Sequence, residues 1–510
     1  MFLLSAGGAE NEKAWSNAPR KGPVYFGALK ARQVEKIFRL QRSLILTRNQ
    51  PGPMAQAIAF RAFGALNDPN PTDNKTVTEL KRSMGLGQAT AMVVGIIIGA
   101  SIFVQPSEIA RLVPSVPGVF AAWIVAGLLT LFGALCCAEL ASAFPRTGGV
   151  YVFLKETYSP AVGFLWGWAM FWSMHSGIIA AIAVVFARYV GYFVPLGDSG
   201  IRVVAIAAIL LLSGINYLGV KQGSTLQTIF TLGKVIAVVT ILVLVVVLRS
   251  ASPAVINATA VDQISVVKFA LAVAAGLFAF GGWHMVTYTA EETRRPERTI
   301  PLALVIGTLT VTACYIALNA AYFSALPLDR VASSTRVAAD AAEAVIGRRG
   351  GAAISAVVIF STFGGVSGII LAGPRVYFAM ARDGLLFRWA AAVHPRFQTP
   401  HRAIVLQAIW SSVLVATGTY RALFTRVIYT EWIFFGLMVL GLFLLRRRPG
   451  YAPSYRAWGY PILPVIFILA SFFIVANQIV SEPRESLIGL GIVALGLPVY
   501  YLWGRRSVGR

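Results

Sequence analysis

The chain has 510 residues, of which 57% are hydrophobic and 13% are charged, and its formal net charge is +23. This is more apolar surface than the core of a soluble protein of this length could hide, so a soluble globular protein is excluded. Hydrophobic runs of about 18 residues or more recur, each long enough to cross a hydrocarbon layer of about 30 Å as a helix. A β-barrel is excluded because residues 235–248 are apolar at successive positions, with Thr240 as the one exception, rather than at alternate ones. The sequence therefore predicts an all-α polytopic membrane protein.

The hydrophobic runs predict 12 transmembrane spans in a cell-membrane protein whose N- and C-termini are both cytoplasmic. The predicted spans are 88–110, 119–144, 160–194, 201–218, 224–248, 267–290, 299–325, 351–381, 403–420, 427–445, 461–480 and 486–504. Basic clusters at 294–298, 446–448 and 505–506 lie just beyond span ends, where cytoplasmic Lys and Arg are expected. The positive charge thus indicates membrane topology, and nucleic acid is not an expected partner.

Residues 1–87 are polar and lack the apolar core of a signal peptide. They are expected to form a cytoplasmic N-terminal extension, either disordered or, over 31–48, a basic amphipathic helix on the inner membrane face. Cys136, Cys137 and Cys314 all fall inside predicted spans, so neither a disulfide framework nor a metal site is expected. No nucleophile elbow, HExxH motif or phosphate-binding loop occurs, so no cofactor and no enzymatic activity are expected.

Small residues interrupt two of the predicted spans. Those of span 88–110 are Gly95, Gly99, Ala100 and Ser101, and those of span 267–290 are Gly276, Gly281 and Gly282. Such residues commonly serve close helix packing in membranes. The two spans are five spans apart, however, and interrupted spans at matching positions of two halves are typical of an inverted repeat with its binding site at the bilayer midplane.

Several longer motifs resemble those of a known family. Residues 99–103 (GASIF) are similar to the GSGIF break of the amino acid-polyamine-organocation (APC) permeases. Residues 278–302 resemble the sixth-span region of the L-type and cationic amino acid transporter branch, including an acidic pair and a P-x-R-x-I-P exit. Residues 138–160, 216–221 and 374–389 resemble the inner loops of the same family. The motifs occur in the family's order from about residue 85 to about residue 480.

The resemblance implies a LeuT-type 5+5 inverted repeat followed by two C-terminal helices. The first repeat would comprise residues 88–248, the inverted repeat 267–445 and the appended helices 461–504. It also implies sodium-independent transport of an amino acid by alternating access, either coupled to protons or as exchange. A permease-like amino acid sensor, which binds without transporting, is the alternative. The sequence leaves open whether an accessory subunit binds.

The two interruptions suggest how an amino acid would be held. A break near Gly99 frees backbone amides at the N-terminus of a half-helix, which suits a carboxylate. A break at Gly281 frees backbone carbonyls that accept from an ammonium group, and one molecule that carries both groups on one carbon is an α-amino acid. The predicted substrate-binding residues are Ile98, Gly99, Ala100, Ser101, Ile102, Phe278, Ala279, Phe280, Gly281, Trp283 and His284.

The resemblance implies that Phe278 is an aromatic gate over the substrate. Phe280 and Trp283 make the predicted side-chain pocket apolar, which favours a neutral amino acid. The sequence departs from the family's pattern at two points: Ser101 replaces the second glycine of GSGIF, and Ser367 replaces the asparagine of an Asn-Gly pair.

Ionisable residues inside spans are costly and indicate function. Lys234 is the predicted coupling group, with the carbonyl near Gly95 and the hydroxyls of Ser361 and Thr362 as its partners. The resemblance implies that this lysine takes the place of a sodium ion. For the other ionisable residues, the expectations are a structural contact near the inner interface for Glu139, a hydrogen bond between helices for Glu431, and packing, pocket-lining or proton-relay roles for His175 and His284.

Overall fold

The computed structural model describes residues 82, 84–99, 101–218, 230, 232–233, 265–397, 399–417 and 420–507. These residues belong to a single compact unit that begins at Leu80. Apart from one isolated parallel bridge between Met84 and Thr293, the regular structure in these ranges is helical. The predicted all-α class is confirmed for this part of the chain.

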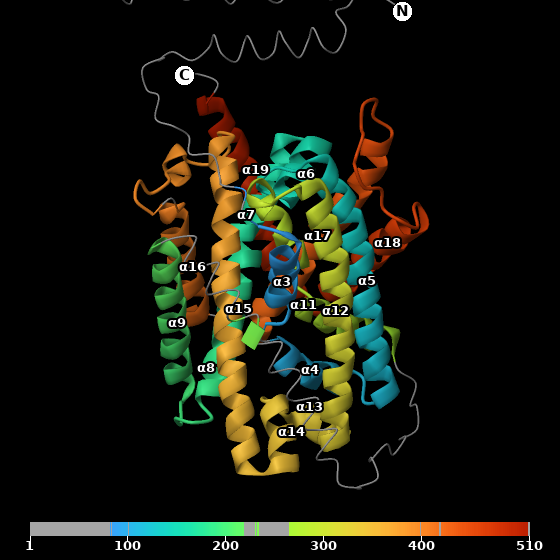
Figure 1. Ribbon diagram of the computed structural model, residues 1–510, viewed down its shortest axis with the longest axis vertical. Helices are drawn as coiled ribbons and strands as arrows, with labels where there is room; N and C mark the ends of the chain where they lie inside the picture. Colours follow the sequence, from blue (N-terminus) through green and yellow to red (C-terminus); the bar gives the residue numbers. More distant parts are fainter. Residues whose placement is uncertain are drawn as a thin grey trace, which may run out of the picture. The chain divides into compact units, whose positions relative to one another are not determined.

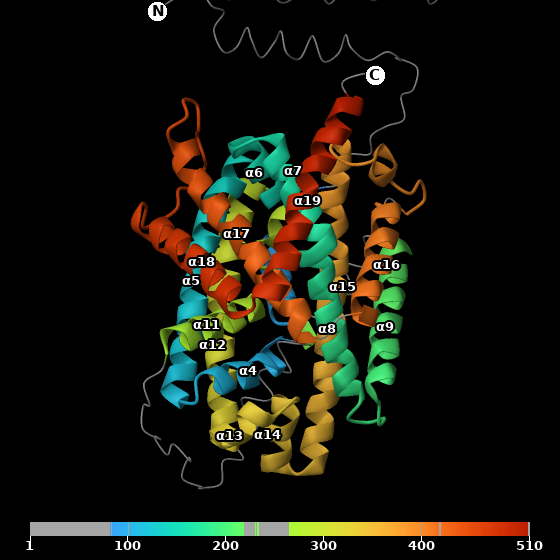
Figure 2. The same cartoon turned by 180° about the vertical axis from the view of Figure 1, so that it is seen from behind.

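The helices follow one another along the chain in the order shown in Figures 1 and 2. The first set is α3 (Leu86–Ile97), η1 (Ser101–Phe103), α4 (Gln105–Leu112), α5 (Val116–Ala143), α6 (Val150–Thr157), α7 (Pro160–Ala169), η2 (Met170–Met174), α8 (His175–Val190) and α9 (Asp198–Leu218). The second set is α11 (Val266–Ala279), η3 (Trp283–Glu292), α12 (Pro296–Ala325), α13 (Leu328–Ser333), α14 (Val337–Ile346), α15 (Arg348–Arg382), η4 (Arg388–Ala391), α16 (His401–Thr417), α17 (Tyr420–Arg446), α18 (Ile462–Ser481) and α19 (Pro483–Ser507).

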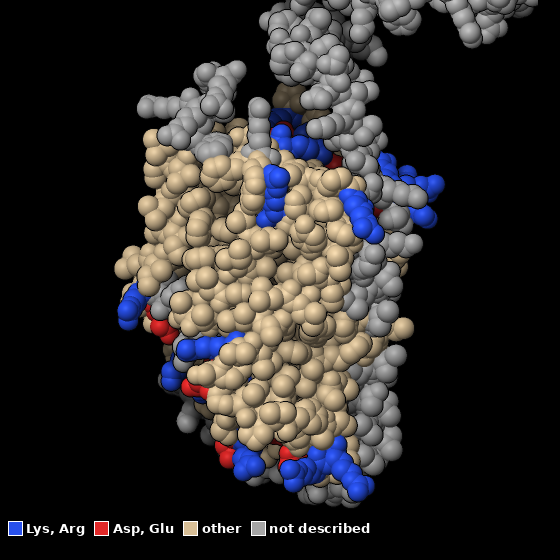
Figure 3. All heavy atoms as spheres, turned by 90° about the vertical axis from the view of Figure 1, so that its left-hand side faces the viewer, with Lys and Arg blue, Asp and Glu red and all other residues tan. Residues whose placement is uncertain are grey.

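Within the described residues, 9 helical stretches are long and apolar enough to cross a membrane, and a shorter apolar stretch covers Ser486–Leu502. Their outward faces carry large apolar side chains, such as Val203 on α9 at 66% exposure and Leu469 on α18 at 65%. In Figure 3 a broad tan area without charged side chains occupies the middle of the face shown. The chain is therefore a polytopic membrane protein. Nearly all of the predicted span 224–248 lies outside the described residues.

The long helices begin at local signals that the sequence contains. The Ser115 hydroxyl accepts a hydrogen bond from the Gly118 amide at 3.4 Å and caps α5, while the Ser159 hydroxyl does the same for α7 from the Val162 amide at 3.4 Å. A proline lies in the first turn of each of these helices, where its missing N–H costs nothing. Between them, residues 150–157 form the short helix α6, in a stretch that the motif comparison treated as a loop.

Helix packing depends on glycines at close crossings. A Cβ built on Gly127 of α5 would lie 2.6 Å from the Thr312 Cγ2 of α12, and one on Gly307 of α12 would lie 2.5 Å from the Val93 Cγ1 of α3. Lipid is as apolar as a protein core, so helices in a bilayer gain stability from such close contact and from interhelical hydrogen bonds. These crossings hold α3 between α12 and its other neighbours, near the centre of the molecule (Figure 1).

A buried ion pair fixes the end of α17. The Arg446 guanidinium donates to the two carboxylate oxygens of Glu139 at 2.9 and 2.5 Å, and it lies 3.8 Å from the centroid of the Tyr460 ring. The Ala457 amide also donates to the same carboxylate at 2.6 Å. Glu139 is fully buried, so its charge needs these partners. The predicted structural role of Glu139 is confirmed.

Candidate functional site

The first helix break lies where the sequence predicts it. Helix α3 ends at Ile97, and Ile98 leaves the helical region with ψ at 73°. The Gly99 amide turns back to the Ile97 carbonyl at 2.6 Å, and the chain resumes as η1 at Ser101. Ile98 and Ile102 are buried and Ser101 is 6% exposed, whereas Ala100 lies outside the described residues.

The second break lies at the predicted glycine pair. Helix α11 ends at Ala279, the Gly281 amide donates to the Phe278 carbonyl at 3.0 Å, and Gly282 has φ at +90°. A Cβ on Gly282 would also lie 2.5 Å from the Ile96 Cγ2 of α3. Only glycine can adopt this left-handed backbone conformation without strain and leave room for the Ile96 side chain. The second break therefore packs directly against the last turn of α3, which precedes the first break.

A tyrosine that the sequence analysis did not single out connects the two breaks. The Tyr315 hydroxyl, on α12, lies 2.8 Å from the Ile97 carbonyl and 2.8 Å from the Ala279 carbonyl. These are the last residues of α3 and α11, so their carbonyls have lost their intrahelical donors. A hydroxyl has a single proton and donates to one carbonyl at a time. The only available sequence signal was general: the hydroxyl of a tyrosine inside a predicted span usually finds a hydrogen-bond partner.

The predicted ammonium acceptors are already partly used within the protein. The Phe278 carbonyl accepts from Gly281, and the Ala279 carbonyl faces Tyr315. Each carbonyl oxygen has a second lone pair, so neither contact prevents a further hydrogen bond. The Phe280 ring packs against Tyr315, with centroids 5.0 Å apart, and the Trp283 ring packs against Phe435 at 5.1 Å.

The predicted coupling group is described only in part. Lys234 lies outside the described residues. Gly95 is buried in α3, and Ser361 and Thr362 are buried in α15, which packs against α3. The Thr362 hydroxyl donates to the Val358 carbonyl of its own helix at 2.8 Å, while the Ser361 hydroxyl has no partner among the described residues. Both hydroxyl oxygens can accept a hydrogen bond, and among the described residues only that of Thr362 uses its proton.

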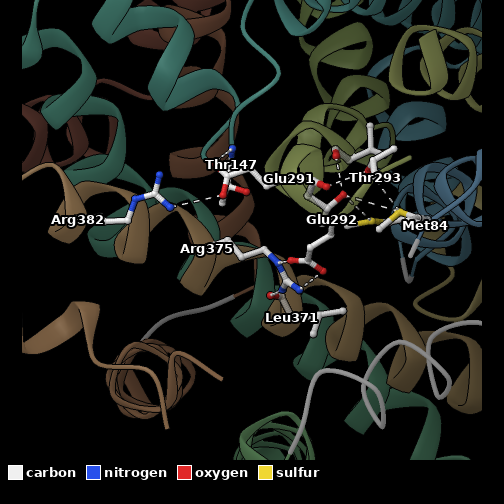
Figure 4. A network of polar contacts seen from close by, with 11 residues as sticks. Met84, Thr147, Glu291, Glu292, Thr293, Leu371, Arg375 and Arg382 are labelled. Atoms are coloured by element: carbon white, nitrogen blue, oxygen red, sulfur yellow. Dashed lines mark hydrogen bonds and ion pairs between the residues drawn. The ribbon is translucent and has the colours of Figure 1, made fainter. Parts of the chain in front are cut away.

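A network of polar contacts joins the far ends of the broken helices (Figure 4). Met84, just before α3, accepts a hydrogen bond from the Arg294 amide at 2.8 Å and donates to the Glu292 carbonyl at 3.0 Å. The Glu292 carboxylate, at the end of η3, receives two hydrogen bonds from Arg375 of α15, at 2.8 and 3.1 Å. Both side chains are nearly buried, at 12% and 8% exposure. This network therefore fixes α3, η3 and α15 to one another.

Neighbouring contacts extend this network towards α6. The Glu291 carboxylate accepts from the Thr147 amide at 3.3 Å and lies 3.5 Å from Arg382. A Cβ on Gly149, where φ is +49°, would lie 2.1 Å from the Thr287 hydroxyl, so the turn before α6 rests directly on η3. The two acidic residues of the sequence motif therefore form different ion pairs. The pair of Glu292 with Arg375 is nearly buried, and the pair of Glu291 with Arg382 is half-exposed.

Asp383 connects the end of α15 to α6. It accepts hydrogen bonds from the Tyr151 hydroxyl at 2.6 Å and the Lys155 ammonium at 2.6 Å. Burial and the contact with Asp383 raise the pKa of the Tyr151 hydroxyl above its usual range, so it remains a donor. Within the part of the chain that the structure describes, no group of His, Cys, Asp or Glu side chains is arranged to hold a metal ion.

Comparison with known proteins shows to which family the chain belongs. The sequence profile of the amino acid permease family matches residues 84–496. The chain belongs to this family. It is 33% identical to the serine/threonine exchanger SteT of Bacillus subtilis, over 84% of this chain and 98% of SteT. It is 32% identical to the human b(0,+)-type amino acid transporter 1, over 84% of this chain and 88% of that one, and 28% identical to the human cystine/glutamate transporter, over 83% and 86%. The resemblance seen in the motifs is confirmed.

We expect Tyr315→Phe to lower the free energy of unfolding by about 1–2 kcal/mol, because two buried carbonyls lose their shared donor. Tyr322→Phe, on the same helix, is the matched control, since the buried Tyr322 hydroxyl has no partner among the described residues. That change should shift stability by no more than about 0.5 kcal/mol. Thermal unfolding of the purified proteins measures both. Equal losses in the two variants would contradict the bridging role of Tyr315.

We expect Arg375→Gln to loosen the network around Met84, because it leaves the Glu292 carboxylate buried without its cation. Hydrogen–deuterium exchange of the peptide that contains Met84 should accelerate about tenfold or more. Arg382→Gln, which removes an ion pair whose arginine is 51% exposed, should accelerate the same peptide by no more than about fivefold. Identical exchange in wild type and Arg375→Gln would show that this ion pair does not hold the network closed.

Proposed function

We propose that this chain is a secondary transporter that moves an amino acid across the membrane by alternating access, without catalysis or a cofactor. The observation that carries the proposal is the pair of helix breaks, which Tyr315 brings to one place. Broken helices expose backbone donors and acceptors that a continuous helix uses internally. The relatives support this proposal, since they are by name amino acid transporters and exchangers.

The proposed substrate site lies between the two breaks. Amides at the start of the half-helix formed by η1 and α4 would bind the substrate carboxylate, and carbonyls at the end of α11 would bind its ammonium group. The proposed site residues are Ile98, Gly99, Ala100, Ser101, Ile102, Phe278, Ala279, Phe280, Gly281, Trp283 and His284. Support comes from the described residues of this set, which lie at the two breaks or in the turn that follows each.

We propose 12 spans for the whole chain, with both termini cytoplasmic and residues 1–87 forming a cytoplasmic extension. Residues 88–248 and 267–445 would form two inverted five-span repeats, and 461–504 the two appended helices. The equivalent placement of breaks in α3–α4 and α11–η3 supports this division. The network of Figure 4 would then be a closed gate on the cytoplasmic side.

We further propose that transport is sodium-independent, either as exchange or with proton coupling. Lys234, Gly95, Ser361 and Thr362 would form the coupling group, with the lysine ammonium in place of a metal cation. The Ser361 hydroxyl supports this, because it has no partner among the described residues and lies on α15, which packs against α3. One of the three relatives reported above supports exchange by its name, the serine/threonine exchanger SteT.

We expect Ser101→Leu to abolish amino acid binding while the protein remains folded. Ser101 is 6% exposed, so the longer side chain must enter the space where a carboxylate would meet bare amides. Ser324→Leu, at an exposed position of α12, is the control for the same chemical change. Binding is measured by thermal shift with the common amino acids, since a ligand of the folded state stabilises it. Wild-type binding by Ser101→Leu would remove the first break from the site.

We expect amino acid flux into proteoliposomes to be the same with and without sodium, and to be strongly reduced by Lys234→Ala. The reason is that the lysine supplies the positive charge that a bound sodium ion would otherwise bring. Flux is measured for wild type and variant, with and without a proton gradient. A strict sodium requirement, or normal flux in the variant, would refute the coupling role. Binding without any flux would instead favour an amino acid sensor.

A further inference from the structure

Glu431 differs from the other buried carboxylates of this protein. Glu139 and Glu292 each receive two hydrogen bonds from an arginine. Glu431, on α17, is 6% exposed, yet among the described residues its carboxylate makes neither a hydrogen bond nor an ion pair. The hydrogen bond between helices expected from the sequence is not found among the described residues and stays a prediction. A buried acid without a partner requires a different explanation.

The surroundings of Glu431 place it beside the second helix break. One turn further along α17, the Phe435 ring packs against His284 at 4.8 Å and against Trp283 at 5.1 Å. Those two residues open η3, directly after Gly282. Further along η3, the Tyr288 ring packs against His284 with ring centroids 5.5 Å apart. Glu431 thus faces the first turns of η3, next to the proposed substrate site.

Other unpaired polar atoms gather at this place. Both ring nitrogens of His284 are buried without a partner among the described residues. The His175 Nε2–H donates to the Ile369 carbonyl at 2.8 Å, but its Nδ1 has no partner among the described residues. The two histidines are close enough for their charges to interact. His175 follows the π-helix η2, an irregularity that often marks functional sites and that reorients the side chains around it.

No permanent positive charge faces Glu431 from the described elements around it. Of the nearby titratable groups, Tyr288 of η3 interacts electrostatically with Glu431, with Cys137 of α5 and with Tyr377 of α15, while His284 of η3 interacts with His175 of α8. An ionised carboxylate buried among such groups is strongly unfavourable unless a cation or hydrogen-bond donor accompanies it. A group that balances the ionised Glu431 must therefore bring a positive charge, or the carboxyl must itself bind a proton.

We propose that Glu431 is the side-chain subsite of this transporter and selects an amino acid with a cationic side chain. The proposal rests on the transport function proposed above. A lysine-like substrate binds to the ionised carboxylate, with His284 and Tyr288 beside its terminal nitrogen, whereas a neutral amino acid binds only when Glu431 is protonated. Each bound substrate thus brings one positive charge, either its own or a proton. This replaces the neutral preference that Phe280 and Trp283 suggested from sequence alone.

The test is equilibrium binding of lysine and leucine to the purified full-length protein at pH 6 and pH 8. Wild type should bind lysine more tightly at pH 8 and leucine more tightly at pH 6, because proton binding to Glu431 opposes the first and permits the second. Glu431→Gln should weaken lysine binding by about tenfold or more and should make leucine affinity independent of pH. Glu482→Gln, in the turn between α18 and α19, is the control for the same chemical change and should behave as wild type.

Lysine binding that survives Glu431→Gln, or leucine binding that is equally pH-dependent in that variant, would overturn the subsite. The subsite would also be overturned if the wild type bound leucine independently of pH and did not bind lysine. The proposed transport function would remain in that case. If neither lysine, leucine nor any other common amino acid stabilises the wild type, the proposed function itself fails. Thermal unfolding without ligand confirms that Glu431→Gln is folded before its binding is compared.

Discussion

The need to satisfy backbone groups inside a bilayer governs the centre of this protein. Lipid offers no hydrogen bonds, so a helix that stops in mid-membrane must find partners for its last carbonyls elsewhere. Helices α3 and α11 both stop there, and the Tyr315 hydroxyl meets the Ile97 and Ala279 carbonyls from a third helix. Because one proton serves two acceptors, this contact joins the breaks while leaving hydrogen-bonding capacity unused. A polar ligand requires carbonyl oxygens that can still accept a hydrogen bond, and here such oxygens from both breaks lie close together.

The contacts around the breaks also divide the two interrupted spans into two pairs. On one side, the Met84 bridge joins the start of α3 to the end of η3, and the Glu292–Arg375 ion pair holds η3 against α15. On the other, α4 packs against α11, where a Cβ on Gly276 would lie 3.8 Å from Ile109. Each pair is held together, and the chain between the pairs is the non-helical backbone of the two breaks. Relative motion of one pair against the other would therefore bend the chain where the substrate is proposed to bind, which is how alternating access uses interrupted helices.

The sequence predicted what depends on local pattern. Apolar runs predicted the membrane helices, and clustered small residues predicted both breaks, because a left-handed backbone at Gly282 and a close approach by Ile96 require glycine. It did not predict Tyr315, whose importance depends on two carbonyls brought together from separate helices. Nor did it predict that Glu292 pairs with Arg375, 83 residues away. Lys234 and the fifth predicted span stay predictions. Partner choice among polar side chains is a tertiary property, and no periodicity encodes it.

Burial alone does not distinguish a structural acid from a functional one, but its partners do. Glu139 and Glu292 each meet an arginine, and each joins elements that must stay together. Their charge is balanced permanently, so neither has a reason to exchange ligands. Glu431 is as hidden as Glu292, yet the described residues supply it with no cation. An ionised Glu431 needs a balancing charge that the described residues do not supply, and the proposed subsite assigns this charge to a substrate or to a proton. A membrane protein that keeps one carboxylate unbalanced next to two broken helices is suited to carry that charge across.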